Sequence, residues 1–352
     1  MIMPRFLFRL DVSPFTGTGH LRRCLTLAEE LKEQGADVFF ACRLKSFNIE
    51  KYMAHIAAEW EEYDWSLTPE DDARKVVQSC MKYQVDSVIV DHYRADENYQ
   101  RNLYESGIRW LQFDGAARFP FWADWVLNIS PAASLNLYEG LRKRKETRFL
   151  LGPTYAPLRR EFREFRDRQP RNRAVRTILL TFGGGDDRGA TIFCLEAIRA
   201  VEDDSIEKII LLSSANPNMD VILKWNQAVN NNVRVIINAE KTANYMASAD
   251  LAITAGGMTV FELASLGVPA IILQIADNQI PITRAWRQRG YGFDMGRLDR
   301  LHPEDLQLAI ISLTQDAAHR EAMSVAGQQM VDGLGAMRLA QVLLSREMEK
   351  VV

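Results

Sequence analysis

The sequence predicts an α/β protein made of two doubly wound parallel-sheet domains that face each other across a cleft. Strand-like apolar runs alternate with helical patterns, which is typical of a parallel sheet covered by helices. The alternation stops at a polar stretch near the middle of the chain and then starts again. A chain of 352 residues is long for one core and comfortable for two domains.

The first half begins with a strand-like run at 6–12, followed by an amphipathic helix. Apolar residues repeat at helical spacing from Leu21 to Leu31, and Gly35 supplies a C-terminal stop. The remaining β-branched and aromatic runs predict further strands at 37–43, 87–91, 108–113 and 125–129.

The stretch 159–176 is rich in arginine, contains Pro170 and has few apolar residues. A basic arm for nucleic acid is an alternative, but Glu161, Glu164 and Asp167 interrupt the charge, which favours a solvated linker helix. We therefore expect an N-terminal domain at 1–165 and a C-terminal domain at 175–335. A last helix lies in 336–352, and its return to the first domain is left open.

The second half repeats the plan of the first. Strands are predicted at 177–182, 208–213, 233–238, 251–254 and 269–275, with helical segments between them. Ligands of such sheets bind beyond the carboxyl ends of the strands, and the polar and glycine-rich clusters of this chain follow strands. The functional residues are therefore expected at the cleft.

The composition predicts a soluble globular protein. Hydrophobic residues make up 47% and charged residues 25%, and a formal charge of -3 gives no reason to expect nucleic acid. No apolar run approaches the length of a membrane span, and no cleavable apolar leader precedes the first strand. We expect a cytoplasmic monomer with a small-molecule partner and no stable association with membranes.

The chemistry is expected to need no metal and no cofactor. The four cysteines, which lack paired close spacing, are interpreted as reduced core residues: Cys24, Cys42, Cys80 and Cys194. No cluster of carboxylates and histidines has metal-ligand spacing, and Asp186 with Asp187 is interpreted as a loop and not as a Mg²⁺ site.

The segment Gly17, Thr18, Gly19 and His20 joins the first strand to the first helix. Glycines allow a tight turn and close approach of a ligand, and the free amides of a helix start attract anions. The same partial positive charge disfavours an imidazolium, so His20 suits a general base. A dinucleotide site is the alternative, but Arg22 occupies the place of the third glycine.

A second glycine site follows the strand at 251–254. Amides at Gly257 and Met258 and the hydroxyl of Thr259 suit a phosphate, and Glu262, one turn further on, suits ribose hydroxyls. A simple helix N-terminus is the alternative interpretation. The backbone at Gly183 and Gly184 offers a further surface for a nucleotide.

Nearly the whole chain resembles the hydrolases that release UDP from a diacetamido-trideoxy-hexose in pseudaminic acid biosynthesis. Their fold is called GT-B and is shared with the MurG-type peptidoglycan-precursor glycosyltransferases. The resemblance rests on motifs in one order and spacing, at 9–11, 17–20, 23–25, 90–93, 151–155, 158–159, 182–184, 249–253, 257–262 and 276–279.

The resemblance implies roles for particular residues. His20 would be the base, and Tyr93 and Asn278 would be further catalytic residues. Substrate contacts would come from Arg9, Asp11, Gly17, Thr18, Gly19, Asp91, Tyr155, Arg159 and Gln279. The UDP would lie on the second domain, with Gly183, Gly184, Gly257, Met258, Thr259 and Glu262.

The implied reaction is the displacement of UDP from the anomeric carbon by water, with inversion. UDP is a good leaving group, so its departure needs amide dipoles more than a protonated carboxyl, and one base can suffice. The alternatives are a glycosyltransferase that moves the sugar to an acceptor hydroxyl, and a non-catalytic UDP-sugar-binding protein of the pathway.

The sequence also departs from the family pattern. Asp114 is followed by Gly115 and Ala116, where relatives carry two adjacent acids, and the segment 51–65 is longer than the minimal plan. Loops of this kind set specificity, so the substrate could be a related UDP-sugar.

Overall fold

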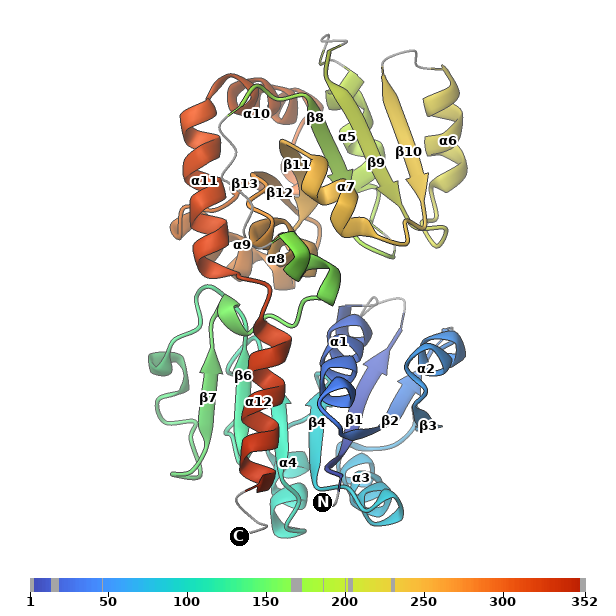
Figure 1. Ribbon diagram of the computed structural model, residues 1–352, viewed down its shortest axis with the longest axis vertical. Helices are drawn as coiled ribbons and strands as arrows, with labels where there is room; N and C mark the ends of the chain where they lie inside the picture. Colours follow the sequence, from blue (N-terminus) through green and yellow to red (C-terminus); the bar gives the residue numbers. More distant parts are fainter. Residues whose placement is uncertain are drawn as a thin grey trace. The chain divides into compact units, whose positions relative to one another are not determined.

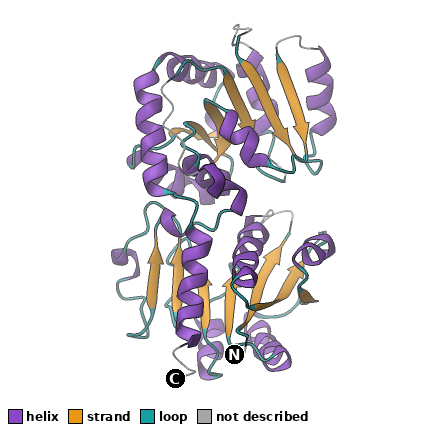
Figure 2. Cartoon of the chain, viewed as in Figure 1, coloured by secondary structure: helices purple, strands orange, loops and turns teal. Residues whose placement is uncertain are grey.

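The computed structural model describes residues 3–13, 19–45, 47–165, 173–185, 187–199, 201, 205–228 and 232–348. Contacts between Cα atoms divide the chain into two compact units. Unit 1 contains Met1–Pro157 together with Leu334–Val352, and unit 2 contains Leu158–Gly333. Each unit has one parallel sheet flanked by helices (Figure 2).

The sheet of unit 1 has seven parallel strands in the order β3-β2-β1-β4-β5-β6-β7. The central strands are buried along almost their whole length because helices cover both faces. The strands are β1 (Arg5–Val12), β2 (Asp37–Leu44), β3 (Glu59–Glu62), β4 (Ser87–Asp91), β5 (Trp110–Phe113), β6 (Trp125–Asn128) and β7 (Arg148–Leu151).

The helices of unit 1 begin where the sequence supplies caps. The Thr68 side chain accepts a hydrogen bond from the Asp71 amide at the start of α3, and Asp96 does the same for Tyr99 at the start of α4. Figure 1 shows these helices around the sheet: α1 (Gly19–Glu33), α2 (Glu50–Ile56), α3 (Pro69–Tyr83), α4 (Glu97–Glu105) and α12 (Gly335–Met348). The unit also contains the 3₁₀ helices η1 (Leu135–Tyr138) and η2 (Pro153–Tyr155).

The last helix, α12, packs on unit 1 against α1 and η2. Ala336, Leu339 and Leu343 are buried in this contact. A Cβ atom on Gly335 would lie 2.1 Å from the carbonyl oxygen of Ala156, so only glycine fits at the start of the helix.

The sheet of unit 2 has six parallel strands in the order β10-β9-β8-β11-β12-β13. The strands are β8 (Thr177–Thr181), β9 (Glu207–Leu212), β10 (Val233–Ile237), β11 (Leu251–Ala255), β12 (Ala270–Gln274) and β13 (Phe293–Arg297). The helices are α5 (Ala190–Arg199), α6 (Met219–Ala228), α7 (Thr242–Ser248), α8 (Met258–Ser265), α9 (Ile280–Gln288), α10 (Pro303–Gln315), α11 (Ala317–Met330), η3 (Arg160–Phe165), η4 (Asp277–Gln279) and η5 (Leu298–Arg300).

The predicted fold class, two parallel α/β sheets, is confirmed, but three strands were not predicted: β3, β7 and β13. All three lie at sheet edges, where a strand has one neighbour and less need of apolar residues. The sequence of β3 contains three glutamates, and that of β13 contains Gly296.

The segment 159–176 is only partly described. Its residues Arg160–Phe165 form η3, and the Phe162 side chain is fully buried in unit 2. The interpretation of this part as a solvated linker helix is therefore wrong, because Phe162 packs in a core. In the described part of the chain, no helix combines the length and apolar composition needed to cross a membrane.

Candidate functional site

The first cluster of polar side chains lies at the carboxyl edge of the unit 1 sheet. His20 is in the first turn of α1, as predicted, and Asp91 is the last residue of β4. The Nδ1 atom of His20 lies 2.7 Å from Oδ1 of Asp91. The hydrogen bonds of the ring to other described residues run through Nδ1, which leaves Nε2 as the nitrogen available to a ligand.

Arg23 completes this cluster from the same face of α1, three residues after His20. Its Nε donates to Oδ2 of Asp91 over 2.6 Å, and its second nitrogen donates to Oδ1. The guanidinium also lies over the Phe113 ring, 4.6 Å from the centroid. Asp91 is 1% exposed, so nearly all of its interactions are with the protein.

The carboxyl group of Asp91 is ionised. Burial opposes its ionisation, but the charge of Arg23 and the interactions with His20 outweigh burial and hold the pKa of Asp91 well below its usual value. The carboxylate therefore accepts hydrogen bonds from both partners at once.

Tyr93 lies beside His20. The two rings meet edge to face with centroids 5.0 Å apart, and Tyr93 is 63% exposed. Among the predicted catalytic residues, the structure thus brings His20 and Tyr93 together.

Arg9, Asp11 and Asp91 were expected to contact substrate, but their side chains are turned into the protein. Arg9 is fully buried, donates from Nε to Asp72 on α3 over 2.9 Å, and donates from NH1 to Asp11 over 2.7 Å. This network ties β1 to α3 and leaves Arg9 no exposed surface for a ligand.

His92, between Asp91 and Tyr93, is buried. Its Nδ1 accepts a hydrogen bond from the Arg94 amide, and its ring packs edge to face on Tyr99. Burial, together with the charge of Arg9, lowers the pKa of His92 to about 3. The ring is therefore neutral at physiological pH.

The other residues predicted for the unit 1 site are Gly17, Thr18, Gly19 and Tyr155. Gly17 and Thr18 lie outside the described residues, and Gly19 is the first residue of α1. Tyr155 is half-buried at the end of η2.

The second cluster lies at the carboxyl edge of the unit 2 sheet, around the start of α8. Gly257 is the N-cap of this helix, and Met258 and Thr259 follow it in the first turn. A Cβ atom on Gly183 would lie 3.8 Å from Oγ1 of Thr259, so the turn after β8 adjoins the start of α8. Gly184 is half-buried in the same turn. The residues of the predicted phosphate site thus follow two neighbouring strands, β8 and β11.

Glu262 lies one turn into α8 and interacts with Arg159. Arg159 NH2 lies 3.3 Å from Oε1 of Glu262 and donates to Oγ1 of Thr242 over 2.5 Å. Arg159 also pairs with Glu161 over 2.6 Å. The guanidinium therefore orients the carboxylate that was predicted to bind ribose.

Asn278 and Gln279 lie in η4, which follows β12. Asn278 is exposed, as a ligand-binding residue requires. Gln279 differs, because its Oε1 accepts a hydrogen bond from the Ile275 amide over 3.0 Å and so holds the turn after β12.

The described residues contain no group of three or more histidine, cysteine or acidic side chains that could hold a metal ion. Asp187 accepts hydrogen bonds from the amides of Gly189 and Thr191 and so caps α5. The four cysteines are free and buried, and burial raises the pKa of each thiol.

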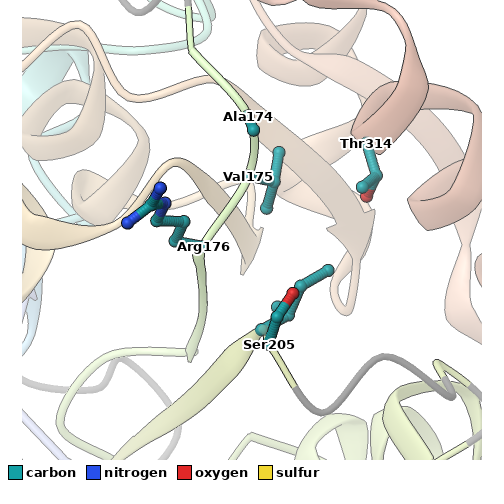
Figure 3. Close-up of a pocket in the computed structure, with 6 residues that line it drawn as sticks. Ala174, Val175, Arg176, Ser205 and Thr314 are labelled. Atoms are coloured by element: carbon teal, nitrogen blue, oxygen red, sulfur yellow. The ribbon is translucent and has the colours of Figure 1, made fainter.

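A cavity of about 410 Å³ lies in unit 2 (Figure 3). Ala174, Val175 and Arg176 precede β8, and Ser205 precedes β9, so the cavity adjoins the amino ends of the strands. Ligands of parallel sheets bind at the carboxyl ends, so the glycine site is the better candidate for a nucleotide.

Two parallel-sheet units of this kind define the GT-B fold, and solved structures agree. MurG from Acinetobacter baumannii matches with a TM-score of 0.69 and 17% identity over 97% of this chain and 100% of that chain. UDP-GlcNAc 2-epimerase from Neisseria meningitidis matches with a TM-score of 0.63 and 13% identity over 97% and 100%.

Sequence similarity gives a closer relationship. Residues 191–333 match the model of the glycosyltransferase family 28 C-terminal domain. The UDP-2,4-diacetamido-2,4,6-trideoxy-beta-L-altropyranose hydrolase of Campylobacter jejuni is 26% identical over 82% of this chain and 97% of that protein. The resemblance predicted from the motifs is thus confirmed.

Two further relatives widen the comparison. The spore coat polysaccharide biosynthesis protein SpsG of Bacillus subtilis is 22% identical over 93% of this chain and 94% of its own length. An uncharacterized protein of Methanocaldococcus jannaschii is 26% identical over 75% of this chain, and the chain spans about half of its length, 54%. Together the similarities indicate that the protein is an enzyme.

Proposed function

We propose that the protein hydrolyses a UDP-linked diacetamido-trideoxy-hexose to the free sugar and UDP. A water oxygen attacks the anomeric carbon, the bond between that carbon and the phosphate oxygen breaks, and UDP leaves with the electron pair. His20 takes the proton of the water, and the configuration inverts.

The observation that carries this proposal is the pairing of His20 with Asp91. A carboxylate on Nδ1 fixes the tautomer in which Nε2 carries the lone pair, and it stabilises the charge that the ring gains with the proton. Tyr93 is exposed beside the ring and is suited to contact the sugar.

Unit 2 supplies the nucleotide site in this proposal. The amides of Gly257 and Met258, with the Thr259 hydroxyl, would bind the diphosphate, and Glu262 would bind the ribose. The backbone at Gly183 and Gly184 adds donors beside them, and Asn278 is exposed on the turn after β12. Positioned donors of this kind stabilise the leaving group without a metal ion.

The substrate class and its setting come from the relatives. The C. jejuni relative is named for the diacetamido-trideoxy-altropyranose, and a Helicobacter pylori relative is named both for that hydrolase and for a pseudaminic acid cytidylyltransferase. We accordingly propose a role in nonulosonate biosynthesis of the pseudaminic acid type. The protein would act in the cytoplasm as a monomer, with neither nucleic acid nor a stable membrane association.

Transfer of the sugar to an acceptor hydroxyl is the second candidate. The family 28 glycosyltransferase match at 191–333 favours it, since the same nucleotide site would serve either reaction.

UDP release from a panel of UDP-sugars, with and without acceptor alcohols, separates the two reactions. Hydrolysis gives the same rate without acceptor, and in ¹⁸O-water the label enters the sugar. UDP release that depends on an acceptor would favour the transferase. Label in UDP would mean attack at phosphorus and would contradict the role of His20.

A further inference from the structure

We propose that Arg23 is a positioning residue that orients Asp91 and offsets its charge, so that His20 can accept a proton from water. This inference rests on the proposed function, in which His20 accepts the proton of the attacking water.

The geometry is a planar fork on a carboxylate. Nε and the second nitrogen of Arg23 reach the two oxygens of Asp91, so the carboxylate cannot rotate without losing both bonds. Oδ1 is also the oxygen that meets Nδ1 of His20. Fixing the carboxylate therefore fixes the imidazole.

Arg23 is itself held in place. Its guanidinium lies over the Phe113 ring from β5, and its side chain is 19% exposed, whereas that of Asp91 is 1% exposed. A partly buried cation beside a buried anion is weakly screened by solvent.

The charge that acts on the His20 ring depends on the titratable groups around His20, Asp91 and Arg23. The other titratable groups of the cluster are Tyr93, whose ring meets that of His20, Cys24, whose thiol donates to Oδ2 of Asp91 over 3.5 Å, and His92, the residue after Asp91. Burial keeps His92 uncharged, and burial raises the pKa of the Cys24 thiol well above its usual value.

Beyond His92, Arg9 is paired with Asp72 and Asp11. Among the described residues, Asp91 and Arg23 are thus the charged groups that contact the His20 ring. Without Arg23, the anion would favour the protonated ring, and a protonated ring cannot accept the proton of water.

Three variants test the inference. Arg23→Gln removes the charge, Arg23→Lys keeps the charge but loses the planar fork, and Arg22→Gln changes an exposed neighbour on the same helix. The ring titration of His20 is followed by NMR of carbon-labelled histidine, with His20→Asn identifying its signal. The pH dependence of kcat/KM for UDP release is measured beside it.

In Arg23→Gln we expect the titration midpoint of His20 and the acidic limb of kcat/KM to move to higher pH together, so that kcat/KM falls on the acidic side of the profile. In Arg23→Lys we expect the midpoint to stay near that of the wild type while kcat falls several-fold. Arg22→Gln should match the wild type in both.

A midpoint in Arg23→Gln equal to that of the wild type would overturn the inference. The NMR titration needs no turnover, so it decides the role of Arg23 even if the wild-type protein releases no UDP. The absence of UDP release would instead contradict the proposed function.

Discussion

Gly256 and Thr283 are packed so closely that a methyl group on Gly256 would lie 2.4 Å from Cγ2 of Thr283. Thr283 is fully buried on α9, and its Oγ1 accepts a hydrogen bond from Gln274 over 2.9 Å, so it cannot move aside. This contact holds the glycine turn after β11 against α9, and Gln279 adds a second contact at 3.1 Å.

Gly256→Ala should therefore destabilise unit 2 by about 1 to 3 kcal/mol, the usual cost of an overpacked core, and should weaken UDP binding. Urea unfolding and calorimetry with UDP measure the two effects. Thr283→Ser removes Cγ2 and keeps Oγ1, so the double variant should be more stable than the sum of the single effects predicts. Strict additivity would show that the clash is relieved in another way.

His20→Asn should bind UDP as the wild type does and lose roughly 10² to 10⁴ in turnover, the usual effect of removing a general base. His55→Asn, an exposed substitution, is the control and should keep full activity. Near-normal turnover of His20→Asn would exclude His20 as the base.

Glu262→Ala should weaken UDP binding by about 1 to 3 kcal/mol, because charge-assisted hydrogen bonds to the ribose are lost. Calorimetry in EDTA measures this and tests whether binding needs a divalent ion. Glu196→Ala, an exposed change on α5, should leave affinity unchanged. Equal affinity of Glu262→Ala and the wild type would remove Glu262 from the nucleotide site.

The buried His92 should make the protein sensitive to mild acid. Its folded pKa of about 3 lies below its unfolded value of 6.5, so the unfolded chain binds more protons between these values, and stability falls as pH falls through that window. Between pH 7.5 and pH 5 this contribution is about 2 kcal/mol.

His92→Asn should lose less stability over this pH range than the wild type, as measured by urea unfolding at both pH values. The exposed substitution His319→Asn should retain the wild-type dependence. An unchanged dependence in His92→Asn would show that another group is responsible for it.

The strands that could be predicted from sequence are those whose residues are apolar because helices cover both faces. Strands β4 and β11, for example, are buried at every residue, whereas the edge strand β3 has glutamates in three of four positions. The edge strand β10 is partly exposed but rich in valine and isoleucine, so its composition also predicts a strand. An edge strand is held by backbone hydrogen bonds to its neighbour, and these leave little trace in composition.

The site was predictable where the chemistry is local. A glycine turn before a helix identified the surroundings of His20 and of Thr259. The partners of His20 were harder to predict, because Asp91 is 71 residues away. Arg9 shows the same limit: its motif predicted a ligand contact, but Asp72, 63 residues away, takes its guanidinium. The proximity of Arg23 to His20 could be predicted, because the two residues lie three positions apart on one helix and so share a face.

The position of α12 has a consequence for the order in which the protein can fold. Since unit 1 needs residues from both sides of Leu158–Gly333, it is complete only after the ribosome has made all of unit 2. Until then, the faces of α1 and η2 that α12 covers lack their partner. Unit 2 comes from one continuous stretch and can complete its folding first. The N-terminal part of unit 1 is therefore synthesised first, but unit 1 is the last to be completed.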